Sequence, residues 1–175
     1  MARSLTAIIK ASITGTYTND STGASDSINV NENSSLSNGT GANKAQRVWE
    51  STGRSISTGS SETLDLYDLG SVDIGAGAGL DALGQALAFT GIKGLYIKNS
   101  DTSTGTLTVG NESTAATWNA LFASDTGSIA LVPGASILVQ DPSALGLAVN
   151  DSSNHLLKLA DSSGGLTYDI VVIGI

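Results

Sequence analysis

The sequence predicts an all-β protein built as an antiparallel β-sandwich. The composition is the first indication, because 21 glycines, abundant Ser, Thr and Asn, and only 14% charged residues suit strands and turns better than helices. The second is a repeated alternation of apolar and polar residues, the period of a strand with one buried face. The third is spacing, since Gly- and Ser-rich corners divide the chain into about eight to ten such segments.

The length and the charge of the chain narrow the class of protein. At 175 residues we expect one domain with a core of its own. The net charge of −8 argues against nucleic-acid binding, because a phosphate backbone repels an acidic surface. The absence of Cys excludes disulfides and sulfur-based zinc sites. No membrane segment is expected, since the longest apolar run, residues 170–175, is far below the roughly 20 residues of a membrane helix.

The first predicted strand covers residues 5–13. One face of it carries the alternate residues Leu5, Ala7, Ile9, Ala11 and Ile13. Such a strand can belong to the domain's own sheet or extend as an arm that pairs with a neighbouring subunit. Ile28 and Val30 then predict a short strand. Residues 31–43, where Leu36 is one of two apolar side chains, are predicted to be a long polar loop.

The next segments continue the pattern. A pair of strands is predicted for residues 46–57, with the break at Thr52 and Gly53. Trp49 is expected to lie in the core, since a large aromatic side chain gains most from burial. Residues 62–69 alternate again and predict another strand. The segment 72–83 is ambiguous, because glycines open it and leucines then follow at helical spacing, so that it fits a short helix or a turn.

Residues 87–110 are predicted to form the hairpin around which the sheet is organised. The outgoing strand runs through Leu95 and Ile97, and the returning strand alternates Leu107 and Val109 with threonines. Between them, residues 99–105 are rich in the short polar side chains that end strands. The sequence therefore predicts that these two strands pair with each other.

The C-terminal part supplies the remaining strands. Residues 118–122 fit a short helical or looped element. The later strands are predicted at residues 127–132, 135–139, 145–149, 156–159 and 168–173, with a tight turn at Pro133-Gly134 between the first two. The last of them is apolar on both faces, which indicates a central position in a sheet.

Two segments suggest chemistry, and each has a simpler explanation. Residues 77–82 match the GxGxxA pattern of dinucleotide-binding loops, with Asp101 about where a ribose-binding acid would follow. No strand-helix-strand units surround the motif, so a glycine-rich connection is the favoured interpretation. Four carboxylates suggest calcium binding or glycoside hydrolysis, although they lack EF-hand spacing and outward acids mostly serve solvation. They are Asp65, Asp68, Asp73 and Asp81.

The remaining candidates are a histidine and a set of aromatic residues. Any Ser-His-Asp arrangement must use His155, the only histidine, but a surface position at a strand start is the favoured interpretation. Aromatic side chains can stack on sugars, and the candidates are Trp49, Trp118, Tyr17, Tyr67 and Tyr96. With 5% aromatic residues, the core is expected to use most of them. The sequence thus predicts no catalytic, cofactor-binding or metal-binding residue, and no enzyme.

Four sequence motifs follow one another along the chain from residue 62 onward. They are LYIKN at residues 95–99, TLTVG at 106–110, the Pro133-Gly134 turn and YDIVVIG at 168–174. In this order the chain resembles small virion structural proteins of tailed bacteriophages and prophages. The resemblance implies a jelly-roll-like sandwich without catalytic activity, which decorates or cements the outer surface of a phage head.

The resemblance also implies partners. The chain is expected to be made in the cytoplasm of a bacterial host, to form a dimer or trimer, and to bind the major capsid protein of a phage head. Residues 1–61 would form the N-terminal arm and polar loops, and residues 62–175 the main sandwich, of one domain. The predicted assembly contacts are Leu5, Ala7, Ile9, Ala11, Ile13 and Leu36. The alternative function is a carbohydrate- or receptor-binding module of a phage fibre or tail.

Overall fold

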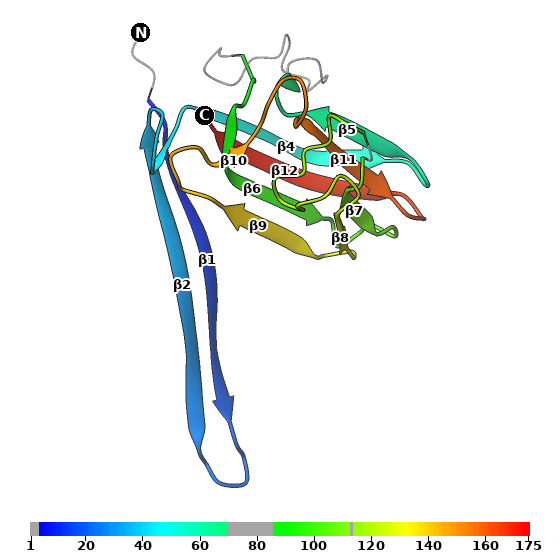
Figure 1. Ribbon diagram of the computed structural model, residues 1–175. Helices are drawn as coiled ribbons and strands as arrows, with labels where there is room; N and C mark the ends of the chain where they lie inside the picture. Colours follow the sequence, from blue (N-terminus) through cyan, green and yellow to red (C-terminus); the bar gives the residue numbers. More distant parts are fainter. Residues whose placement is uncertain (1–3, 70–85, 113) are drawn as a thin grey trace.

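The computed structural model describes residues 4–69, 86–112 and 114–175. Within them lie twelve β-strands, arranged as a sandwich body and a long two-stranded arm that projects from one end of it (Figure 1). The predicted all-β sandwich is therefore confirmed. Among the described residues, no helix is long and apolar enough to cross a membrane.

The arm consists of β1 (Thr6–Thr18) and β2 (Ser25–Asn38), which pair antiparallel along their whole length. The short strand β3 (Lys44–Ala45) adds to β2 in parallel and leads into the body. The predicted polar loop at residues 31–43 is wrong, because residues 31–38 belong to β2. Residues 31–38 contain Leu36 as their only apolar side chain, so they lack the apolar period that marks a half-buried strand.

Five strands form the sheet from which the arm departs. They are β10 (Leu147–Ala148), β6 (Gly91–Asn99), β12 (Leu166–Gly174) and β4 (Arg47–Ile56) in that order, with β9 (Ser136–Gln140) also on β6. The central position predicted for the last strand is confirmed, since β12 lies between β6 and β4.

The strand β4 is continuous, so the prediction of two strands at residues 46–57 is wrong. The residue that suggested a break, Gly53, has a φ of 67°. Its N–H donates to Asp169 Oδ1 at 2.9 Å, close to the point where the register with β12 shifts between Tyr168 and Ile170. Gly53 thus lies at an irregularity of the kind that a β-bulge makes, and the strand continues through it.

The second sheet has four strands. In order they are β5 (Ser61–Asp65), β11 (Leu156–Asp161), β7 (Leu107–Gly110) and β8 (Ser128–Leu131). The predicted hairpin at residues 87–110 is therefore wrong, because β6 and β7 belong to different sheets. The Asn99 side chain holds the corner between them, donating to the carbonyls of Gly105 at 3.0 Å and Leu131 at 2.9 Å. The Pro133-Gly134 turn likewise joins β8 in one sheet to β9 in the other.

The inward faces of the two sheets bury one apolar core. Trp49 lies in it as predicted, and so does Trp118, whose Nε1–H donates to the carbonyl of Ala148 at 2.9 Å. Residues 118–122 form turns rather than a helix. The ambiguous segment at 72–83 lies outside the described residues.

Candidate functional site

The arm has one apolar and one polar face. Directly opposed residues share a face, and alternate residues along a strand return to it. The apolar face carries Ala7, Ile9, Ala11, Ile13 and Tyr17 from β1 with Leu36, Val30 and Ile28 from β2, together with Ser34, Glu32 and Asp26. On the polar face Ile8 stands among Ser, Thr, Asn and Lys side chains. The arm is therefore amphipathic along its length.

The base of the apolar face packs onto the chain's own body. Ile9 and Leu36 are buried with Ala45, and Leu5, Ala7 and Ile173 pack against them. A Cβ on Gly94 would lie 2.4 Å from Ile9 Cδ1, so Ile9 rests directly on the backbone of β6. Glycine leaves room for Ile9 at this position, since an added Cβ would force the end of the Ile9 side chain to move.

The outer half of the same face is uncovered. Its large side chains keep high exposed fractions: 66% for Ile13, 72% for Tyr17, 55% for Ile28 and 49% for Val30. Ile13 lies directly opposite Val30, so the four side chains form one patch, called here the distal patch. Apolar patches of this kind mark interaction surfaces, and a hairpin without further packing is only marginally stable in water.

Lys93 fastens the arm to the body. It is fully buried, and its Nζ donates to the carbonyls of Gly41 at 3.3 Å, Ala144 at 2.9 Å and Ser143. Gly41 belongs to the turn that leaves β2, so one ammonium group connects the arm to two body segments. Burial lowers the pKa of Lys93, and the charge of Asp141 opposes that shift. Sequence reasoning missed this residue, although a single charge inside the apolar run GIKGLYI was a signal.

The outer face of the five-stranded sheet is also apolar beside the arm. Tyr96 pairs with both Val171 and Leu138, which places the three side chains in one row across the sheet, called here the outer row. A small apolar hollow of about 30 Å³ separates this row from Ile9 and Ile173. The outer face of the other sheet differs, since it presents Thr63, Thr108, Ala130 and Lys158.

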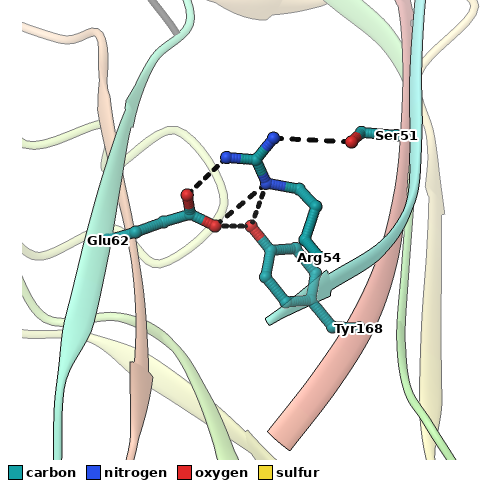
Figure 2. Close-up of polar contacts among 4 residues, drawn as sticks. All are labelled: Ser51, Arg54, Glu62 and Tyr168. Carbon is teal, nitrogen blue, oxygen red and sulfur yellow. Dashed lines mark hydrogen bonds and ion pairs between the residues drawn. The ribbon is translucent and has the colours of Figure 1, made fainter. Parts of the chain in front are cut away.

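A polar network braces the two sheets inside the body (Figure 2). Arg54 on β4 donates to Glu62 on β5, with Nη2 2.5 Å from Oε2, and its Nε lies 3.1 Å from Tyr168 Oη on β12. The Tyr168 hydroxyl donates to the same carboxylate. Burial alone would raise the pKa of Glu62, but the hydrogen bonds from Arg54 and Tyr168 outweigh it and hold this pKa below 4.5. The carboxylate is thus fully engaged in connecting the sheets.

The predicted catalytic candidates are only partly brought together. His155 Nδ1 lies 2.8 Å from Asp65 Oδ1, which also accepts the backbone N–H groups of Tyr67 and Asp68. Asp101 lies far along the chain from them and pairs with Lys98 at 3.4 Å. Asp73, Asp81 and the glycine motif at 77–82 lie outside the described residues. In the described part of the chain, no group of three His, Asp or Glu side chains is placed to hold a metal ion.

The sugar-stacking candidates are dispersed. Trp49 and Trp118 are buried, Tyr67 and Tyr96 are half-buried, and Tyr17 is exposed on the arm. An open groove of about 390 Å³ lies at the corner formed by residues 55–57, 102–104 and 164–167. Hydroxyl groups line it, but none of its described lining residues is aromatic. It therefore lacks the stacking platform of a sugar site.

The predicted assembly residues divide between the two halves of the arm. Leu5, Ala7, Ile9 and Leu36 belong to the cluster at the base, where they pack within the chain. Ala11 and Ile13 are exposed on the apolar face. Their contacts with other molecules stay a prediction. Sequence reasoning named Tyr17 only as a sugar-stacking candidate and missed Ile28 and Val30 as surface residues, because the full-length pairing of β2 places them beside Ile13.

Comparisons with known proteins do not add to this description. Neither a protein-family model nor a curated protein matches the sequence. The function must therefore be argued from the arm and from the surface beside it.

Proposed function

We propose that this protein is a non-enzymatic structural component of a virion, a decoration or cement protein that forms oligomers and binds the outer surface of a phage head. The observation that carries the proposal is the distal patch, four large apolar side chains on the outer half of a two-stranded arm. Figure 1 shows that this arm extends away from the body. An isolated monomer gains nothing from such an arm. An assembling subunit gains contacts beyond the reach of its body.

The dimensions of the arm support this role. From Lys10 to Thr18 the ribbon extends about 25 Å at the usual rise of a strand. Complete burial of a large apolar side chain contributes roughly 1.5–3 kcal/mol, so covering the distal patch would contribute several kcal/mol to association. Many modest contacts of this kind hold a cement protein on a shell without any active site.

The strand order supports a jelly-roll reading of the sandwich. Without the two-residue β10, the strands divide four and four, as β4-β12-β6-β9 and β5-β11-β7-β8. The connections β4–β5, β6–β7, β8–β9 and β11–β12 each pass from one sheet to the other. This winding is the one expected of a double-sheet jelly roll, an architecture that virion proteins use.

The charge fits an exterior position on the particle. The net charge of −8 disfavours adhesion to packaged nucleic acid. Carbohydrate binding has weaker support, since the aromatic side chains do not gather at the hydroxyl-lined groove.

The experiment compares the full chain with an arm-shortened chain on capsid shells. Residues 11–32 are replaced by Asn-Gly, which closes a two-residue turn between the directly paired Lys10 and Asn33 and keeps the buried base. Co-sedimentation with shells of the major capsid protein encoded in the same genome is measured. We expect saturable binding of the full chain and at least tenfold weaker binding of the shortened one.

A full-length control carries Thr14→Ala and Asn29→Ala, a directly opposed pair on the polar face, and should bind as the unaltered chain does. If the full chain does not bind shells, the proposal fails. If the shortened chain binds equally well, the arm has no part in attachment.

A further inference from the structure

We infer that the distal patch of one copy of this chain packs on the outer row of a second copy. The occupant of the apolar arm face is thus the sheet face of a neighbouring subunit. This inference deepens the proposed function and rests on it, because it states how the oligomer is held together.

The first argument is that the chain already makes this kind of contact with itself. At the base of the arm, Ile9 packs on Gly94 and beside Ile173, on the outer face of the five-stranded sheet. The same arm face therefore meets the same sheet face once within each molecule. The outer row continues that surface, and the small apolar hollow next to Ile9 is lined by all three residues of that row.

The second argument is that a molecule cannot cover its own row. The ribbon is paired without interruption from Thr6 with Ser37 to Thr18 with Ser25, and it points away from the body (Figure 1). Ile13 and Val30 consequently stay exposed, and so does Leu138 on the outer row. Both surfaces are uncovered in one molecule and are complementary between two.

The third argument is a match of charge and spacing. Glu32 lies two residues from Val30 on the apolar arm face, and Lys98 lies two residues from Tyr96 on the outer face of the sheet. Two residues along a strand span about 6.6 Å in both cases. An arrangement with Val30 on the outer row thus brings the Glu32 carboxylate to the Lys98 ammonium, which lies 3.4 Å from the exposed Asp101 and has Asp169 opposite it on β12.

The other surfaces of a second copy fit less well. Packing two apolar arm faces together would bring Asp26 and Glu32 of one arm against the same acids of the other, and like charges repel. The four-stranded sheet presents Thr63, Thr108 and Lys158, which offer little apolar area. The five-stranded sheet is therefore the partner surface.

Mixed cysteine variants test the pairing directly, since the chain has no cysteine of its own. Full-length Val30→Cys is mixed with full-length Leu138→Cys under mild oxidation. We expect a mixed disulfide-linked dimer in good yield. Asn29→Cys, on the polar face of the same strand, replaces Val30→Cys as the control and should give at least tenfold less. Val30→Cys chains that link only to each other would indicate arm-to-arm packing and overturn the inference.

Self-association of full-length variants, measured by sedimentation velocity, gives a second readout that needs no cross-link. Ile13→Asp and Leu138→Asp should each weaken association at least tenfold. The matched controls are Thr14→Asp on the polar arm face and Ala130→Asp on the four-stranded sheet, and these should change it less than twofold. Circular dichroism and thermal unfolding show whether each variant is folded. An unaltered chain that stays monomeric overturns the inference.

A charge exchange tests the register. Glu32→Lys and Lys98→Glu should each weaken association, and the double variant should recover most of the loss. If recovery is absent, the proposed alignment is wrong.

Failure of this inference is distinguishable from failure of the proposed function. If the chain is monomeric but still binds shells, the proposed function stands and the packing of the arm on a second copy is wrong. If the chain forms oligomers but does not bind shells, the packing of the arm on a second copy stands and the proposed function is wrong.

Discussion

At the scale of single residues, Glu62 shows how this sandwich keeps a charge in a half-buried position. Its carboxylate lies between the two sheets and is compensated by the Arg54 guanidinium and the Tyr168 hydroxyl (Figure 2). Removing one member of such a group leaves the others without partners, which costs more than the net worth of the contact. The brace is therefore sensitive both to substitution and to acid.

The pH dependence of unfolding tests the brace. The pKa of Glu62 is lowered in the folded state, so its contribution is complete above its ordinary value of 4.5 and is lost as the pH falls through the lower folded value. We expect the free energy of unfolding of Glu62→Gln to be about 1–2 kcal/mol below that of the unaltered chain at pH 7, with the gap closing below pH 4.5. Urea unfolding between pH 7 and pH 2.5 measures both. A constant gap would contradict this assignment.

Lys93 offers a second test at this scale. Met has a similar shape but cannot donate, so Lys93→Met removes the ammonium partner of the carbonyls of Gly41, Ser143 and Ala144. We expect a loss of roughly 2–3 kcal/mol in the free energy of unfolding, measured in urea at pH 7. Lys98→Met on the same strand removes a half-exposed ammonium and should cost less than about 0.5 kcal/mol. Equal losses for Lys93→Met and Lys98→Met would show that the contacts of the buried ammonium add no stability beyond those of an exposed one.

At the scale of elements, Ile9 is the residue of β1 that is buried at the base of the arm, in one cluster with Leu36 and Ala45. Ile9 is buried against Gly94, whereas the adjacent Ile8 faces solvent with 59% exposed. Ile9→Ala removes buried methyl groups and should reduce the protection of the arm by about 2–4 kcal/mol, while Ile8→Ala should change it by less than about 0.5 kcal/mol. Amide hydrogen exchange of β1 and β2 measures this protection. If both substitutions act alike, the arm is not held by this contact.

The elements also show how far sequence reasoning extends. Strands that bury one face, such as β11 and β12, follow from their alternation, and the central place of β12 follows from its apolar character on both faces. The full length of β2 does not, because Ile28 and Val30 mark only its outer part and Leu36 is the only apolar side chain in residues 31–38. Local sequence patterns also do not show that β6 and β7 belong to different sheets. A polar turn has the same kind of sequence whether it closes a hairpin or connects two sheets. Here the buried Asn99 side chain stabilises the connection between sheets by its two hydrogen bonds.

The candidate surface can likewise be predicted only in part from the sequence. The alternation from Leu5 to Ile13 marks the apolar face of β1, but it does not tell which residues the body will cover. That division depends on Gly94, which admits Ile9 and thereby fixes where the arm leaves the sheet. The long-range contact, and not the local pattern, separates the buried base from the distal patch.

At the scale of the whole molecule, the body should be independent of the outer arm. The core lies between the two sheets, and none of the residues replaced in the arm-shortened chain belongs to that core or to the buried base. We expect its unfolding midpoint, measured by thermal circular dichroism, to lie within about 2 °C of the unaltered chain at concentrations where both are monomeric. A large decrease would show that the outer arm stabilises the body within one molecule.

The contact between Gly94 and Ile9 sets the angle at which the arm leaves the sheet. A ribbon that pivots at its root moves its far end many times more than its near end, so a small tilt at one glycine changes the reach of the whole subunit. In an assembly built by arm exchange, that reach sets the distance between neighbours. Gly94→Ala should displace the end of Ile9 and change the tilt of the arm, so that any oligomer held by arm exchange should show altered centre-to-centre distances while each subunit remains folded.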